Sequence, residues 1–317
     1  MPGIEPVAGS GSAPAGQQLG QQLVLANSLK WLGPEVDASL ARARALIDQQ
    51  QDDDEGELNA DAVLAELRLV LGALRMAGCH GGALLAEELC AAVEAVAGGQ
   101  LSSPGAALAA VSGATLQLSD YLDALRHAAP DRAAVLQPAI SEMRLACGRV
   151  AATEADLFVR QMLQINPPLN LPLPDAERLV TASIVAGKLL PAFQVLLLQW
   201  LKGIDVPNTL LKLRKVGDHI ASHAERRETA LLWSAFAAAI DSLVAVPGAD
   251  SLELKRWVGR LGQQIKQLAE KGEDAGLQQA PELAWRLLAH AAPIHHSGSR
   301  WLLLRHYLPL DSTLPIE

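Results

Sequence analysis

The sequence has few aromatic residues, and this shortage restricts the fold. Aromatic residues make up 3% of the 317 residues although half of the chain is apolar, so Ala, Leu and Val have to form the core. This composition has high helix propensity and lacks the aromatic and β-branched enrichment of sheet proteins. The sequence therefore predicts an all-α fold, and its length favours two domains over one.

Cysteine is also scarce. The three cysteines, Cys79, Cys90 and Cys147, form no CxxC pair, which excludes a disulfide framework and a zinc ribbon. We expect free, buried thiols in a reducing compartment.

Basic residues are outnumbered, with 26 Lys and Arg against 35 Asp and Glu and a net charge of −9. Nucleic-acid binding would need a clustered basic surface, so the charge balance argues against this class. The first 18 residues lack both the basic start and the apolar run of a secretory signal. We therefore expect a cytoplasmic protein.

The longest apolar run covers residues 179–201 and is long enough to cross a bilayer. Lys188 and Pro191 lie near its middle and make insertion costly. The run therefore predicts a buried helix of a soluble protein, kinked at Pro191, and no membrane insertion.

The first half of the chain predicts a helical bundle over residues 23–150. Residues 1–22 are rich in Gly, Ser, Ala, Pro and Gln and predict a disordered tail. Pro34 is suited to the first turn of the first helix. Apolar periodicity and stop signals predict five helices joined by short connections, over 33–51, 61–76, 83–97, 104–127 and 131–149. Amphipathic helices joined in this way hide their apolar stripes in a bundle.

A linker is predicted over residues 151–175, because residues 165–175 contain four prolines, which exclude helix. A second helical domain is predicted over residues 176–308. Its expected helices cover 175–190, a segment after Pro191 that ends near 202, 208–227, 228–246, 250–272, 280–292 and 297–308. Residues 309–317 look like a second linker, so we expect that the chain could be the front of a longer protein.

The stretch "LRLVLGALRM" (67–76) looks like the central helix of a histidine phosphotransfer bundle. Such a helix has a phosphoacceptor His, a Lys three residues later and a Gly four residues later on one face. With the glycine aligned on Gly72, the lysine position is Leu71 and the histidine position is Arg68. A guanidinium stays protonated and cannot accept a phosphoryl group, so the helix predicts the shape of a phosphotransfer protein without its chemistry.

The same helix predicts two opposite stripes. Arg68, Gly72 and Arg75 share the predicted exposed stripe, which we interpret as a partner-docking surface. The predicted buried stripe consists of Val63, Leu67, Val70 and Leu74.

Longer segments resemble a known family. "LGALRMAGCHGGALLAEELCAAVEA", "LQLSDYLDAL" (116–125) and "LQPAISEMRLACG" (136–148) are similar to the opening module of Chp-type hybrid chemotaxis kinases of the type IV pilus system and to the non-catalytic FimL scaffold. The second half adds "LLPAFQVLLLQWLKGIDVPNTLLKL" (189–213), "ALLWSAFAAAIDSLV" (230–244) and "LGQQIKQLAEKGEDA" (261–275). The resemblance covers about residues 29–308.

The resemblance implies a degenerate phosphotransfer bundle followed by a second helical scaffold domain. It implies docking of response-regulator or receiver-like proteins and of polar hub proteins that control twitching motility and cyclic AMP synthesis, and recruitment to the cell pole. We expect no enzyme activity, cofactor, metal or nucleic-acid partner. An alternative is that the chain is the amino-terminal portion of an active Chp-type hybrid histidine kinase.

Histidines offer weaker alternatives. His80 lies in a Gly-rich break, where a loop would not hold an imidazole as a helix face does. His219 and His223 lie four apart on a predicted helix and could share a metal in a hydrolase, but no third ligand is evident. His295 and His296 are neighbours on a turn and are expected to point apart.

Three other groups of residues are expected to have no catalytic or phosphate-binding role. Glu87 and Glu88 could be paired catalytic carboxylates, but adjacent helix residues diverge, so we expect both to be solvated at the surface. Gly78, Gly81 and Gly82 follow no strand and are not expected to form a phosphate loop. The tryptophans are expected mostly as core anchors.

Overall fold

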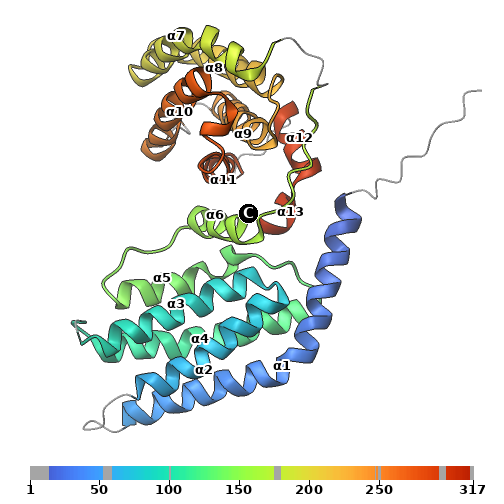
Figure 1. Cartoon of the computed structure of the whole chain (residues 1–317). Helices are drawn as coiled ribbons and strands as arrows, with labels where there is room; N and C mark the ends of the chain where they lie inside the picture. Colours follow the sequence, from blue (N-terminus) through green and yellow to red (C-terminus); the bar gives the residue numbers. More distant parts are fainter. Residues whose placement is uncertain are drawn as a thin grey trace, which may run out of the picture.

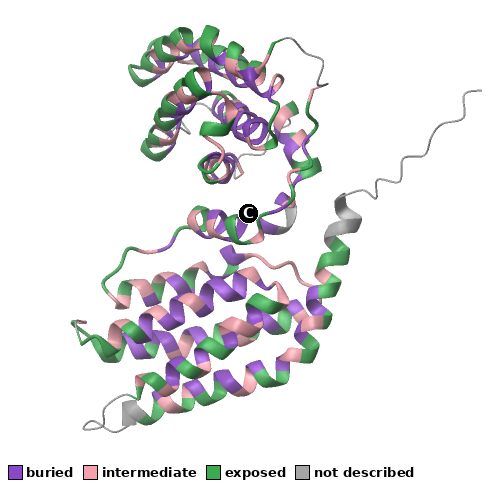
Figure 2. Ribbon diagram, in the orientation of Figure 1, coloured by how far each residue is buried: buried purple, intermediate pink, exposed green. Residues whose placement is uncertain are grey.

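The computed structural model of the chain describes residues 14–52, 59–99, 101–174, 180–246, 248, 251–292 and 298–314. All regular elements within these ranges are helices and none is a strand, so the predicted all-α class is confirmed. Two groups of helices lie at opposite ends of the molecule, and α6 (Glu154–Ile165) lies between them (Figure 1). Each group has its own cluster of buried apolar side chains along its inner faces (Figure 2).

The first group is a bundle. Its helices are α1 (Pro14–Asp52), α2 (Ala60–Ala77), α3 (His80–Ala97), α4 (Pro104–Arg126), the 3-10 helix η1 (Ala133–Leu136) and α5 (Gln137–Ala146). Helices α1 and α3 each pack against both α2 and α4, which closes a four-helix ring, and α5 packs on α3 and α4. Short connections between consecutive helices make neighbours antiparallel.

Helix α1 is longer than the sequence predicts. It begins at Pro14, so the prediction of a disordered tail is wrong for residues 14–22, while residues 1–13 lie outside the described ranges. Pro34 lies inside this helix and not in its first turn. A proline inside a helix removes a backbone hydrogen bond and bends the axis, and α1 bends sharply in Figure 1.

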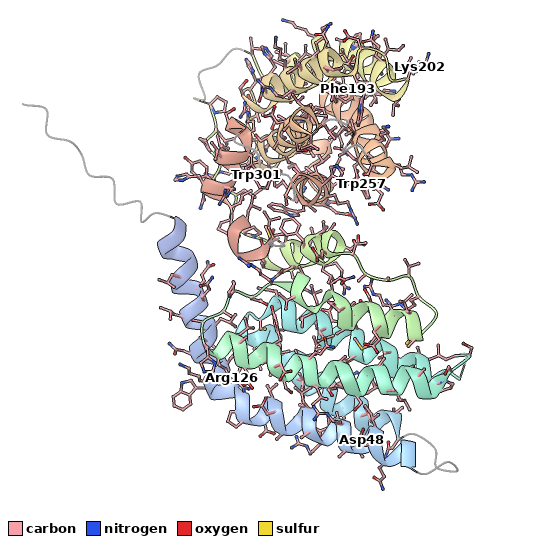
Figure 3. The ribbon with its side chains drawn as sticks, turned by 180° about the vertical axis from the view of Figure 1, so that it is seen from behind. Asp48, Arg126, Phe193, Lys202, Trp257 and Trp301 are labelled. Atoms are coloured by element: carbon pink, nitrogen blue, oxygen red, sulfur yellow. The ribbon has the colours of Figure 1, made fainter. Side chains whose placement is uncertain are left out.

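The bend of α1 lies beside Arg126 of α4 (Figure 3). The Arg126 guanidinium donates to both carboxylate oxygens of Asp37 at 2.9 Å. It also occupies the space of a side chain at residue 33, since a Cβ added at Gly33 would lie 2.6 Å from Nη2 of Arg126. The Gly33–Pro34 pair therefore lets α1 bend and lets α4 approach its backbone.

Helix α6 lies where a linker was predicted, so that prediction is wrong for residues 154–165. Thr153 caps this helix by accepting from the Asp156 amide at 3.1 Å. Leu157 is buried in the first core, whereas Phe158 and Met162 are buried in the second. The apolar residues of α6 thus point to two sides, and one helix joins both cores. Residues 166–174 form neither helix nor strand.

The second group surrounds the buried helix α9. Its elements are α7 (Ala182–Leu201), α8 (Val206–Ala221), α9 (Arg227–Ala245), α10 (Leu252–Lys271), the 3-10 helix η2 (Glu273–Ala275), α11 (Ala280–Ala291), α12 (Ser299–Tyr307) and α13 (Leu310–Thr313). Helix α9 packs against α8, α11 and α12. Phe193 of α7 and Trp233 and Phe236 of α9 meet edge to face, with ring centroids 5.8–6.2 Å apart.

The carboxyl end of the described chain belongs to this core. Leu310 is fully buried and Leu314 is nearly so, which makes the prediction of a linker-like tail wrong for residues 310–314. Residues 315–317 lie outside the described ranges. Four of the six tryptophans are buried as expected, namely Trp200, Trp233, Trp285 and Trp301, whereas Trp31 is 88% exposed.

Two of the described helices, α7 and α9, are long and apolar enough to cross a membrane by length and composition. Helix α9 fills the core, and 78% of its apolar window is buried. Helix α7 has only 28% of its window buried and continues through Pro191 as one helix. The prediction that α7 is a buried helix is therefore wrong for most of its residues.

We expect Gly217→Ala to destabilise the second group by about 1–3 kcal/mol through overpacking. A Cβ at this position of α8 would lie 2.9 Å from Cδ1 of Phe236 and 3.2 Å from the carbonyl oxygen of Trp233. Chemical denaturation measures the change. The matched control is Gly259→Ala in α10, where a Cβ meets nothing within 4 Å and where Ala should stabilise by about 0.5–1 kcal/mol. Equal effects of the two substitutions would contradict this packing.

Candidate docking surface

The outer face of α2 brings Arg68, Gly72 and Arg75 together. Both arginines are exposed and Gly72 is half-buried. The opposite face is the predicted buried stripe, and its four residues are completely buried: Val63, Leu67, Val70 and Leu74. Periodicity alone therefore placed both stripes of this helix correctly.

Both arginines of this face are paired with glutamates of α3. Arg68 Nη2 lies 2.9 Å from Glu94 Oε1, and Arg75 Nη2 lies 2.8 Å from Glu87 Oε1. The face is therefore not an unbalanced cationic patch. Exposed ion pairs contribute about 1 kcal/mol or less, so the arginines can turn to an acidic partner at small cost.

An apolar edge on the same face was missed in the sequence. Leu69 is 62% exposed and Met76 is 81% exposed. At 100° per residue these two side chains lie on the side of Gly72 that faces away from the two arginines. A Cβ at Gly72 would meet nothing within 4 Å, so the centre of the face is flat. The sequence could have indicated this edge, because both residues follow an arginine of the predicted exposed stripe and fall outside the predicted buried stripe.

Glu87 and Glu88 are not independent, solvated carboxylates, so that expectation is wrong. The Glu88 side chain is 5% exposed and accepts from Arg144 of α5 at 2.5 Å and from Arg160 of α6 at 2.6 Å. Arg149 lies 3.1 Å from the other Glu88 oxygen. The two glutamates do diverge along α3, but the helices packed around α3 bring long arginine side chains to both.

This network connects the outer face of α2 to α6. Arg160 reaches Glu87 at 3.0 Å as well as Glu88, and Glu87 is the residue that pairs with Arg75. Gln164 of α6 also donates to Glu87 at 3.0 Å. Glu87 therefore connects Arg75 to the helix that joins the two cores.

The charge on Glu88 is strongly stabilised. Burial opposes its ionisation, but hydrogen bonds from Arg144 and Arg160 outweigh burial and lower the Glu88 pKa from 4.5 to about 2. Because the unfolded chain takes up the proton first as pH falls, this carboxylate stabilises the fold above its unfolded pKa and stops doing so as pH approaches the folded value.

We therefore expect Glu88 to contribute about 3 kcal/mol of stability that is lost between about pH 4.5 and about pH 2. Urea unfolding across this range measures the loss. Glu88→Gln is the control, because it should remove this part of the pH dependence. A variant with the same acid dependence as the parent protein would contradict the assignment to Glu88.

His80 does not lie in a loop, because it is the first residue of α3. Asp131 caps this end of the helix by accepting from the amides of His80 at 2.7 Å and Gly81 at 2.9 Å. Tyr121 donates to the same carboxylate at 2.6 Å. Burial raises the pKa of Asp131, and burial lowers the pKa of His80. His80 is part of a structural helix start, not an exposed phosphoacceptor face.

The pair His219 and His223 does not have the predicted helical arrangement. Helix α8 ends at Ala221, so His219 and His223 do not lie on one helix. Nδ1 of His223 lies 2.8 Å from the carbonyl oxygen of His219. Over the described part of the chain, no three His, Cys, Asp or Glu side chains form a metal-binding group. His295 and His296 lie outside the described residues.

The cysteines are free, as predicted. Cys79 and Cys90 are buried and Cys147 is partly buried. Burial raises the pKa of the Cys79 thiol well above its usual value. Such a thiol is a core side chain and not a nucleophile.

The comparisons with known proteins bear on the second group of helices. The family model described as "FimL scaffold protein second domain" matches residues 180–317, which begin just before α7. The match confirms the resemblance to a FimL-type scaffold, whereas the resemblance to the opening module of Chp-type kinases is not confirmed. No curated protein and no solved structure matches the chain significantly.

Proposed function

Because the family model of the FimL scaffold protein second domain matches residues 180–317, we propose that the chain is a non-catalytic scaffold of type IV pilus chemosensory signalling. In this proposal its first bundle is a phosphotransfer-like domain that docks receiver-like proteins without accepting phosphate. The pathway would be the one that controls twitching motility and cyclic AMP synthesis.

The outer face of α2 is the observation that carries the docking role. It combines a flat centre at Gly72, two exposed apolar side chains and two arginines whose pairs are exchangeable. Apolar contact supplies affinity, and arginines recognise carboxylate or phosphate groups. Arg68 occupies the phosphoacceptor position of the resemblance, and its guanidinium cannot carry a phosphoryl group.

The proposed partners are response regulators with receiver domains and polar hub proteins. The proposed location is the cytoplasm, with recruitment to the cell pole through the hub. A scaffold of this kind needs no cofactor, because its output is the proximity of two bound proteins.

A binding titration with the receiver domains of the pilus system tests this role. Gly72→Trp should weaken binding by at least about tenfold, because it fills the flat centre with a large side chain. Gly113→Trp is the matched control on α4, where a Cβ also meets nothing within 4 Å, and it should bind as the parent does. Equal binding by the parent and Gly72→Trp would refute the docking surface.

A further inference from the structure

The outward face of α7 is apolar, which is unusual for the surface of a soluble protein. Several of its exposed side chains are aliphatic, with Val195 56% exposed, Leu198 52% exposed and Ile184 45% exposed. Leu201 at its end and Ile204 in the following turn are about half exposed as well, at 48% and 51%. Phe193 points from the other side of α7 into the helix group, whereas Lys202 lies at the outer edge (Figure 3).

The region around this face is basic although the chain is acidic. Residues 180–221 and 252–271, which contain α7, α8 and α10, carry ten Lys and Arg and four Asp and Glu. The remaining residues carry sixteen Lys and Arg and thirty-one Asp and Glu. Helices α8 and α10 both pack against α7, so the positive charge borders the apolar face.

Four exposed lysines of α7, the following turn and α8 make no ion pair within the described ranges: Lys188, Lys202, Lys212 and Lys215. No carboxylate of the described residues pairs with them, so their charge is available to an anionic partner. The aliphatic face needs an apolar partner, and the lysines beside it need an anionic one. The partner that binds this face should therefore have an apolar interior and an anionic surface.

Two other occupants fit less well. A second copy would bring the same lysines face to face, and like charges repel. Protein interfaces are depleted of lysine and centre on aromatic or arginine anchors, whereas this face offers aliphatic side chains and lysines. Lysines beside an aliphatic helix face are typical of helices that lie in the headgroup layer of a membrane.

We propose that α7 binds the surface of an anionic phospholipid membrane, lying in the plane of the headgroups. The exposed aliphatic side chains insert between the lipids, and the lysines reach the headgroup phosphates. The helix does not span the bilayer, since Phe193 and Trp200 on its inner side are buried in the second core. Helices α7 and α2 lie at opposite ends of the molecule, so a membrane-bound chain would present its α2 face to the cytoplasm (Figure 1).

Co-sedimentation of the full chain with vesicles tests this proposal. The parent should sediment with vesicles that contain phosphatidylglycerol, less so at high salt, and hardly with vesicles of phosphatidylcholine alone. Val195→Ser/Leu198→Ser and Lys188→Glu/Lys202→Glu should each weaken the binding by at least about tenfold. Val135→Ser and Lys30→Glu alter exposed residues of the first bundle and serve as apolar and charge controls, which should bind like the parent.

Three results would overturn the proposal: no sedimentation of the parent with anionic vesicles, equal sedimentation with neutral vesicles, or unchanged binding of the α7 variants. A dimer that Val195→Ser/Leu198→Ser converts to a monomer would assign the face to a second copy. The same variants should keep the parent's affinity for receiver domains, so failure here is distinguishable from failure of the docking role of α2.

Discussion

Glu88→Gln should lower the free energy of unfolding by about 3–5 kcal/mol, because removal of one partner of a buried ion pair leaves the other charges uncompensated. Arg144 and Arg160 both direct guanidinium groups at Glu88 and would face a neutral amide in the variant. The effect should be larger than for most substitutions in the bundle, since one carboxylate serves α5 and α6 together.

Glu94→Gln is the matched control for this experiment. Glu94 of α3 also pairs with an arginine, Arg68 of α2, but both side chains of that pair are more than half exposed. Its loss should cost less than about 1 kcal/mol in urea unfolding. Similar small effects of the two substitutions would show that the Glu88 network contributes little to stability.

Asp131→Ala should destabilise the protein by about 2–4 kcal/mol. This carboxylate accepts from the amides of His80 and Gly81 at the start of α3 and from the hydroxyl of Tyr121. Loss of a helix cap costs about 0.5–2 kcal/mol, and an unsatisfied buried hydroxyl adds about 1–3 kcal/mol. Thermal or urea unfolding of the variant measures the sum.

Asn59→Ala provides the comparison for Asp131→Ala. Asn59 caps α2 through one exposed hydrogen bond, to the amide of Ala62 at 3.1 Å. Its loss should cost about 1 kcal/mol. If Asp131→Ala is no less stable than Asn59→Ala, Asp131 acts as an ordinary helix cap and does not hold the start of α3 against Tyr121 of α4.

The sequence predicted the features that are set within a single helix, such as which of its residues are buried and which are exposed. The buried stripe of α2 and the exposure of Arg68 and Arg75 follow from a period of 3.6 residues. The pairing of these arginines could not be predicted, because it requires the register between α2 and α3. The interpretation of Glu87 and Glu88 failed for the same reason, since α5 and α6 supply the arginines that surround them.

The errors of element assignment also have physical causes. Pro34 was placed at a helix start, but the Gly33–Pro34 pair lets α1 bend and continue past it. Residues 154–165 were assigned to a linker because prolines follow them, although the cap at Thr153 and the i, i+4 spacing of Phe158 and Met162 indicate a helix. Helix α7 was expected to be buried because it is apolar, and apolarity does not say which surface covers it.

The most direct test of the scaffold account is a phosphotransfer assay with phosphorylated receiver domains. The parent chain should bind them and acquire no histidine-borne label. The double variant Arg68→His/Leu71→Lys restores the His-x-x-Lys-Gly pattern in α2, with the histidine at an exposed position and the lysine at a half-buried one, and should acquire an acid-labile label. Labelling of a histidine in the parent, or no labelling of a double variant that still binds, would contradict a docking face that has the shape of a phosphotransfer helix without its chemistry.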